Sequence, residues 1–303
     1  MNIRTDLAVE SASMHTDVER GIETESEMIN GVKIERVRIK SNEAANVVGK
    51  PCGNYVTITV RDLSENDRDE YEETCMCVAR ELKNILNIEE KAPVLAIGLG
   101  NEDITADSIG PKSVKKLLIT RHIKEMMPEE VDESVRSVSA LAPSVMAMTG
   151  IETSSIVQGV TEKINPAAVI VIDALAARSM SRLGRTIQIA DTGINPGSGV
   201  GNNRKELSRK TLGVPVIAIG VPMVVDAETV AIDCMEIASK NTQGARELLD
   251  IYKRMEPGNA DMVVTPKDVD SLSERCARII ANGVNIALQS ALGREDIDRY
   301  TQA

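Results

Sequence analysis

Two uninterrupted apolar runs dominate the centre of the chain. Residues 167–173 read AAVIVID and residues 214–222 read VPVIAIGVP, with a polar, glycine-rich stretch between them. Apolar runs of this length without polar alternation are typical of strands that are buried on both faces of a parallel sheet. The first run ends in Asp173. The pattern therefore predicts a carboxylate at the end of a strand, where open α/β sheets present their ligand crevice.

Strand and helix patterns alternate through the rest of this region. Further strands are predicted at residues 93–98, 136–142 and 186–190, and helices at residues 110–123, 152–164, 227–240 and from residue 265 onward. Such alternation predicts an α/β fold, a three-layer α/β/α arrangement with a mostly parallel central sheet. We find neither an internal repeat nor a low-complexity linker. One domain spanning residues 1–303 is therefore expected.

The chain before residue 93 follows a different pattern. Apolar positions alternate along two predicted strands, and their phase slips once in the first: Val32 and Ile34, then Val37 and Ile39, followed by Val56, Ile58 and Val60. This predicts a small antiparallel appendage whose first strand carries a bulge. A helix should follow, with one apolar stripe from Tyr71 to Ile85. Residues 7–30 lack clean periodicity and are expected to form an N-terminal arm that is either exposed or ordered only under some conditions.

Charge and composition restrict the partners. The formal net charge is -11, and the chain of 303 residues has neither Phe nor Trp. An acidic chain without these aromatic residues is a poor candidate for binding nucleic acid directly or for binding an anionic membrane. Because the sequence lacks an 18-residue apolar run and a signal-peptide pattern, we expect a cytoplasmic protein with no membrane association.

Histidine and cysteine usage argues against several kinds of site. His15 and His122 are the two histidines, which makes a His-rich zinc site and a Ser-His-Asp triad improbable. Cys75 and Cys77 fall on a predicted helix, where residues two apart point to different sides and do not chelate one ion. The sequence therefore predicts no metal and no cofactor.

Two glycine-rich segments resemble anion-binding loops only in part. Gly98 and Gly100 follow a predicted strand, but Asp103 occupies the third glycine position of a dinucleotide-binding fingerprint, which leaves a tight turn as the simpler interpretation. The second segment, GINPGSGVGNNRKE at residues 193–206, lacks the Gly-Lys-Ser/Thr ending of a phosphate-binding loop. Two interpretations remain for this segment. It either binds a substrate backbone or an oxyanion, or it is a plain flexible loop. The residues concerned are Gly197, Ser198, Gly199 and Gly201.

Two carboxylates are the main candidates for catalysis. Asp107 follows the first core strand and Asp173 ends another, so both are expected at the carboxyl edge of the sheet. When two carboxylates crowd together, one pKa rises, and the pair then supplies an acid and a base near neutral pH. That arrangement hydrolyses an amide without His or Ser. The alternative is that each Asp only caps the next helix.

Several long segments resemble one family, the germination proteases of spore-forming bacteria. The matching strings are ITADSIGPKSVKKLLITRHI, APSVMAMTGIETSSIVQGV, VIDALAARS, DTGINPGSGVGNNRKE and LGVPVIAIGVPMVVDA, and the match returns in MVVTPKDVD. The resemblance is strong over residues 93–235. It implies a cytoplasmic endopeptidase of the spore core, aspartic-type but unlike pepsin, that degrades small acid-soluble, DNA-binding spore proteins during germination. It also implies a self-processing zymogen, a homotetramer, and catalytic roles for Asp107 and Asp173.

The first residues of the chain resemble the cleavage sites of that family. Residues 4–10 read RTDLAVE, with an acid, a bulky apolar residue, Ala and a later Glu. The resemblance predicts self-cleavage between Asp6 and Leu7, which makes residues 1–6 a propeptide. Without the resemblance, an ordinary polar terminus explains these residues equally well.

A second resemblance keeps other functions open. Gly98, Gly100 and Asn101, followed by Asp107 and Gly110, are similar to a pattern in hydrogenase-maturation endopeptidases, where a carboxylate at this place helps to bind nickel together with a His. A metal-dependent maturation-type endopeptidase is therefore one alternative. A non-catalytic binder of basic spore proteins is the other.

Overall fold

A single large sheet organises the molecule. The computed structural model describes residues 5–14, 21–60, 68–196, 205–239, 247 and 262–301. Within these residues the strand order is β1-β2-β3-β7-β8-β6-β4-β5, with β9 pairing with β8. The strands are β1 (Ile22–Ile29), β2 (Val32–Ile39), β3 (Gly53–Thr59), β4 (Val94–Gly98), β5 (Val138–Leu141), β6 (Ala168–Ala177), β7 (Thr186–Ala190), β8 (Val216–Asp226) and β9 (Val263–Val264).

Helices connect these strands and cover both faces of the sheet. They are α1 (Ala8–Ser13), α2 (Asn42–Val48), α3 (Arg68–Leu86), α4 (Ile109–Val114), α5 (Arg121–Met126), α6 (Met146–Thr149), α7 (Thr153–Ile164), α8 (Arg209–Leu212), α9 (Ala227–Ser239), α11 (Val269–Leu288) and α12 (Arg294–Thr301). Two short 3₁₀ helices, η1 (Thr105–Asp107) and η2 (Met180–Arg182), complete the description. None of the helices in the described part of the chain is long and apolar enough to span a membrane.

The sheet has a parallel half and an antiparallel half. Strands β5, β4, β6 and β8 pair in parallel, whereas β8, β7, β3, β2 and β1 pair antiparallel. The predicted α/β class is confirmed. The antiparallel strands are more than a small appendage, however, because β7 pairs with both β3 and β8 and joins them to the central sheet.

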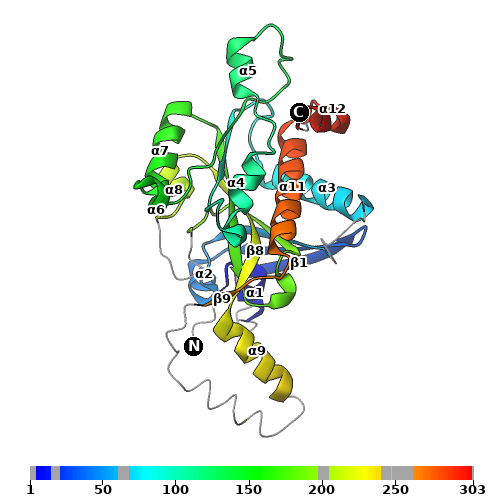
Figure 1. The fold of residues 1–303 in the computed structure, drawn as a ribbon, viewed down its shortest axis with the longest axis vertical. Helices are drawn as coiled ribbons and strands as arrows, with labels where there is room; N and C mark the ends of the chain where they lie inside the picture. The colour runs from blue at the N-terminus through cyan, green and yellow to red at the C-terminus, as the bar shows by residue number, and fades with distance from the viewer. Residues whose placement is uncertain are drawn as a thin grey trace.

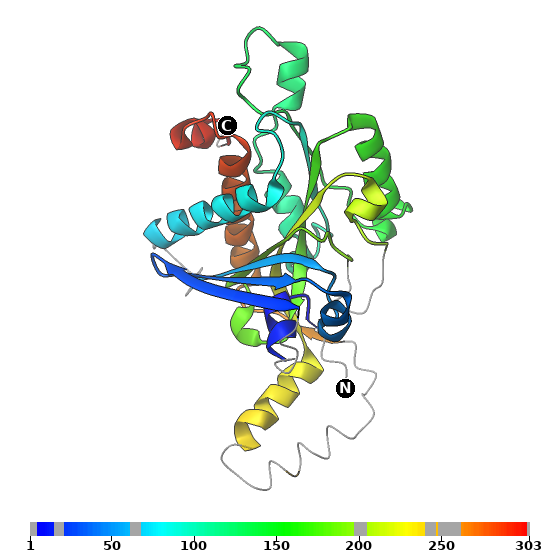
Figure 2. The same ribbon diagram turned by 180° about the vertical axis from the view of Figure 1, so that it is seen from behind.

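The helices form the two outer layers. On one face, α3, α4 and α11 pack over a core that includes Val78, Ile109 and Ile280. On the other face, α7 covers the parallel half, and α1 and α2 cover the antiparallel half. Figures 1 and 2 show α3 and α11 on one side of the sheet and α7 on the other.

The phase slip in β2 places its apolar residues on opposite faces. Val32 and Ile34 join the core beneath α3 and α11, whereas Val37 and Ile39 pack beneath α1 and α2. The pairing with β1 runs continuously from Val32 to Ile39, so the prediction of a bulge is wrong. Because β2 is covered on different faces at its two ends, its apolar pattern changes phase while its backbone stays regular.

The helix predicted over residues 110–123 is divided into α4 and α5. Between them, the side chain of Asn285 on α11 accepts a hydrogen bond of 2.9 Å from the Leu118 N–H and donates one of 3.1 Å to the Lys116 carbonyl. A side chain that satisfies both backbone groups replaces the hydrogen bonds that a continuous helix would make. Tertiary contacts therefore override a local helical pattern here.

Candidate active site

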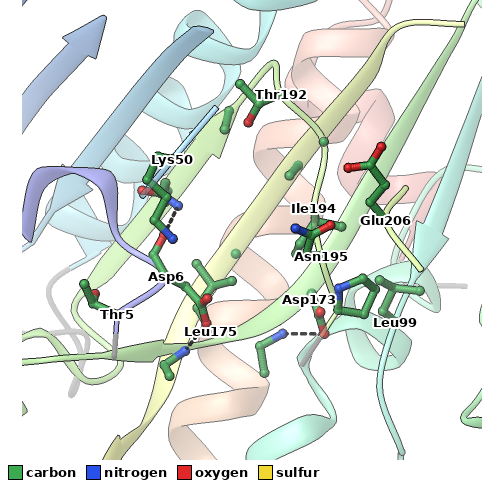
Figure 3. Close-up of a pocket in the computed structure, with 18 of the residues that line it drawn as sticks. Thr5, Asp6, Lys50, Leu99, Asp173, Leu175, Thr192, Ile194, Asn195 and Glu206 are labelled. Atoms are coloured by element: carbon green, nitrogen blue, oxygen red, sulfur yellow. Dashed lines mark hydrogen bonds between the residues drawn. The ribbon is translucent and has the colours of Figure 1, made fainter. Parts of the chain in front are cut away.

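One cavity of about 790 Å³ brings together residues from distant parts of the chain. Its lining includes the two carboxylates singled out from the sequence, Asp107 and Asp173. The wall is completed by the N-terminal segment, by the end of α2 and by the connection between β7 and α8. Figure 3 shows Asp6 and Lys50 on one side of the cavity and Asp173, Asn195 and Glu206 on the other.

Asp107 is held by the turn that follows β4. It lies in η1, and its carboxylate oxygen Oδ2 accepts a hydrogen bond of 2.8 Å from the Asn101 N–H. Gly100 has a φ of +109°, and a Cβ there would lie 2.0 Å from the Asp107 carbonyl oxygen. A glycine is therefore required for the turn to wrap around Asp107. This confirms the tight-turn interpretation of the segment.

A close approach of α4 to the sheet explains the other glycine of the motif. A Cβ on Gly110 would lie 2.2 Å from the Leu99 carbonyl oxygen and 2.6 Å from that of Ile172. The first turn of α4 thus packs directly against the residue that follows β4 and against the middle of β6. The glycines from Gly98 to Gly110 therefore allow close backbone packing, which holds Asp107 beside these two strands.

Asp173 lies within β6, which continues to Ala177. The prediction that the strand ends at Asp173 is wrong, because residues 174–177 still pair with β8. Asp173 shares its face of the strand with Val171 and Leu175, since alternate residues point the same way. Its exposed fraction is 5%, and its Oδ1 accepts a hydrogen bond of 2.9 Å from the Ala174 N–H. The carboxylate is therefore carried by a rigid central strand.

The glycine-rich loop begins and ends at the cavity. Ile194 and Leu207 exchange two backbone hydrogen bonds of 2.9 Å, which bring the two ends of the loop together. Asn195 and Glu206, just inside this closure, line the cavity. The predicted oxyanion residues Gly197, Ser198, Gly199 and Gly201 lie outside the described residues.

The N-terminal segment reaches the same cavity. Asp6 lines it, and the Asp6 N–H donates a hydrogen bond of 2.9 Å to the Ala176 carbonyl on β6. The next residue, Leu7, is fully buried. The expectation of an exposed arm is therefore not met at Leu7, which packs against Leu175 and Ala177 on β6 and Val225 on β8. Sequence periodicity does not reveal such a tertiary contact.

A lysine gives the cavity a basic group. Lys50 follows α2 and lines the cavity on the side of Asp6. Burial lowers the pKa of the Lys50 ammonium group, while the nearby carboxylates of Asp6 and Glu10 act in the opposite direction. Lys50 is thus placed to face an acidic side chain at the position of Asp6.

Two residues that line the cavity, Lys50 and Gln188, were not predicted from the sequence. Lys50 stands beside a helix end and gave no pattern of its own. Gln188 did give a signal, because it is a polar residue in the middle of the apolar strand TIQIA and is almost completely buried. A buried amide in an apolar strand needs hydrogen-bond partners, and its partners are in the N-terminal segment.

Potential metal ligands are dispersed. His122 is exposed on α5, at the opposite end of the molecule from α1 and α2 (Figure 1). Among the described residues, no group of three or more His, Cys, Asp or Glu side chains is arranged to hold a metal ion.

Comparisons with known proteins give a consistent result. The family model described as germination protease matches residues 3–257. A germination protease of Clostridium perfringens (strain ATCC 13124) is 41% identical, and the alignment covers 99% of both chains. The germination protease of Bacillus subtilis (strain 168) is 40% identical, with 98% of this chain and 96% of the relative covered. That of Priestia megaterium is 38% identical, with coverage of 99% and 97%.

These matches extend over nearly the whole chain, and the predicted resemblance is confirmed. They include β4, β6 and β8, which hold the cavity residues. The chain belongs to the germination protease family.

Proposed function

We propose that this protein is an endopeptidase of the spore core that degrades small acid-soluble, DNA-binding spore proteins during germination. Family membership supports a protease of spore germination. The proposed enzyme is a cytoplasmic homotetramer that uses no metal or cofactor and that binds neither nucleic acid nor membrane directly. Its substrates are the proteins that coat the DNA.

The proposed chemistry is attack of water on a peptide carbonyl, activated by Asp107 and Asp173. One carboxylate takes a proton from the water while the new C–O bond forms. The other carries a proton, polarises the carbonyl oxygen, and delivers its proton to the nitrogen as the C–N bond breaks. The observation that carries this proposal is that both residues line one cavity, although they come from different segments of the chain.

The supporting structure around the two residues suits this role. Asp107 is fixed by the Asn101 N–H and Asp173 by a central strand, so neither carboxylate has to be ordered when a substrate binds. The loop that closes at Ile194 and Leu207 carries the backbone N–H groups of Gly197–Gly201. We assign to these groups the stabilisation of the oxyanion that forms during attack.

The same reaction converts the zymogen. The proposed self-cleavage site is the peptide bond between Asp6 and Leu7, and Asp6 lines the cavity. Sequencing the N-terminus of the processed form tests this assignment directly. A mature form that begins at Leu7 is expected, and any other first residue would contradict it.

The protease assignment is tested with a peptide that contains Thr-Glu-Ile-Ala-Ser-Glu. Wild-type protein should cleave it between Glu and Ile at the same rate with and without EDTA. Loss of cleavage in EDTA would favour the metal-dependent maturation-type enzyme instead. A protein that binds the peptide but leaves it intact would be the non-catalytic binder.

A further inference from the structure

The turn that carries Asp107 is tied to α11 as well as to the sheet. Thr105, at the start of η1, donates a side-chain hydrogen bond of 2.8 Å to Asp270 Oδ1 in the first turn of α11. We infer that Thr105 and Asp270 are positioning residues for Asp107, because their contact fixes the turn that holds the Asp107 carboxylate at the cavity. The inference rests on the proposed function, since it requires Asp107 to be a reacting group.

The geometry of η1 couples the side chain of Thr105 to that of Asp107. A 3₁₀ turn has three residues per turn, so its consecutive side chains point in different directions. In η1, Thr105 binds α11, Ala106 packs against the core beneath α3 and α11, and Asp107 lines the cavity. A rotation of this turn would therefore move Asp107 along the cavity wall and break the bond of Thr105 at the same time.

Hydrogen bonds within the turn transmit the contact to the backbone around Asp107. The Thr105 carbonyl accepts a hydrogen bond of 3.3 Å from the Ser108 N–H and one of 2.7 Å from the Ser108 hydroxyl. Ser108 is fully buried. Thr105 and Ser108, which lie on either side of Asp107 in the chain, are thus held to each other. A contact that fixes Thr105 from outside the turn therefore also fixes Asp107.

A second contact fastens the other end of the same stretch to α11. Lys112 on α4 donates a hydrogen bond of 2.6 Å to Ser273 Oγ, and Ser273 Oγ donates one of 3.0 Å to the Asp270 carbonyl. Ser273 is fully buried. Figure 1 shows α4 beside α11. The hydrogen bonds of Lys112, Ser273, Asp270 and Thr105 thus form one chain that spans the stretch containing Asp107.

Helix α11 is a rigid anchor for this purpose. It has 20 residues, and one side of it, including Cys276 and Ile280, is buried in the core. Among the described residues, the cavity lining includes Asp107 but neither Thr105 nor Asp270, so these two act through the turn and not on a substrate. A carboxylate that is aligned before the substrate binds speeds the chemical step. Loss of the contact should therefore lower kcat and leave KM nearly unchanged.

Two substitutions of Thr105 test the hydrogen bond with little change in shape. Thr105→Val removes the hydroxyl donor and keeps the volume, whereas Thr105→Ser keeps the donor. Steady-state cleavage of the peptide that contains Thr-Glu-Ile-Ala-Ser-Glu gives kcat and KM for the full chain of each variant. We expect Thr105→Val to lower kcat about 10-fold and to change KM by less than about 2-fold. Thr105→Ser should retain most of the wild-type kcat.

Substitutions on α11 then assign the acceptor. Asp270→Ala should lower kcat as much as Thr105→Val does. The double variant Thr105→Val/Asp270→Ala should be no slower than either single variant, because all three lack the same bond. Asp268→Ala is the matched control, since Asp268 is also exposed at the start of α11 but its side chain makes no capping hydrogen bond. This control should keep the wild-type kcat.

Several outcomes would overturn the inference. They are a wild-type kcat in Thr105→Val, losses that multiply in the double variant, and an equal loss of kcat in Asp268→Ala. Asp107→Asn in the same assay separates this inference from the proposed function. If Asp107→Asn is inactive while Thr105→Val is fully active, the positioning role alone is wrong. If Asp107→Asn itself remains active, the catalytic assignment of Asp107 is wrong, and the positioning role falls with it.

Discussion

Asp173 lies directly opposite Gly220 in the parallel pairing of β6 with β8. The space that a side chain at position 220 would need is filled by Leu175, whose Cγ would be 2.5 Å from an added Cβ. Leu175 in turn forms part of the pocket that buries Leu7. The candidate catalytic strand, its neighbour and the N-terminal segment are thus one packed unit.

This packing makes a prediction for Gly220→Ala. The new methyl group must displace Leu175, and overpacking of a buried site costs about 1–3 kcal/mol of unfolding free energy. Urea denaturation measures the loss. The double variant Gly220→Ala/Leu175→Ala should lose less than the sum of the single variants, because the clash is gone. Strict additivity would show that Leu175 and position 220 do not compete for space.

Gly100→Ala should affect both stability and catalysis. Its backbone has a φ of +109°, and the added Cβ would lie 2.0 Å from the Asp107 carbonyl oxygen, so Asp107 must move. We expect a loss of about 2 kcal/mol or more in stability and at least about 100-fold in kcat/KM.

Gly213→Ala separates backbone strain from displacement of Asp107. Gly213 also has a positive φ, +76°, but nothing lies within 4 Å of an added Cβ. This variant should lose about 1 kcal/mol and keep its kcat/KM. If both variants retain activity equally, the Gly100 turn does not position Asp107 for catalysis.

An ion pair between half-buried Arg36 and buried Glu81 links β2 to α3. The Arg36 guanidinium binds both oxygens of Glu81, at 2.9 and 2.7 Å, and Glu81 is 1% exposed. These bonds raise the pKa of Arg36 above its ordinary value. Arg36→Met leaves Glu81 buried with only Arg80 as a cation and should cost about 2–3 kcal/mol of unfolding free energy.

The matched change on the same strand should be nearly neutral. Arg38 is exposed and binds Asn54. Arg38→Met is expected to change the unfolding free energy by about 0.5 kcal/mol or less. If Arg36→Met and Arg38→Met lose the same unfolding free energy, the pairing of Arg36 with buried Glu81 makes no specific contribution to stability.

Thiol reactivity should divide the cysteines into two groups. Burial raises the pKa of Cys276 to about 12 and that of Cys77 to about 11, so both stay protonated at pH 8. Cys52 and Cys234 are exposed. Iodoacetamide at pH 8 should therefore modify Cys52 and Cys234 in the folded protein, and peptide mapping identifies the sites. Rapid modification of Cys276 would contradict the packing of α11.

Much of the fold could be predicted from the sequence because apolar periodicity reflects local burial. The runs that became β6 and β8, and the stripe on α3, were recognisable for this reason. The slip in β2 was visible but misinterpreted. The sequence of a single strand does not show which face is covered at each end. In β2 that depends on where α1 and α2 pack, and tertiary contacts decide this.

The candidate site was predicted less completely. Asp107 and Asp173 stood out because each follows or lies in an apolar strand, and the structure places both at one cavity. The end of β6 was misplaced, since a polar residue facing a cavity looks like a strand end in the sequence. The roles of Gln188 and Lys50 were not recognised, because each depends on residues 5–10 lying beside it in space.

The most direct test of the two-carboxylate site is to compare kcat/KM for peptide cleavage in three isosteric variants. Asp107→Asn and Asp173→Asn should each lose at least about 1,000-fold, as expected when a general acid or base is removed, while circular dichroism shows an intact fold. Asp103→Asn, exposed in the same turn as Asp107, should retain wild-type activity. Substantial cleavage by either Asp107→Asn or Asp173→Asn would place the catalytic site elsewhere.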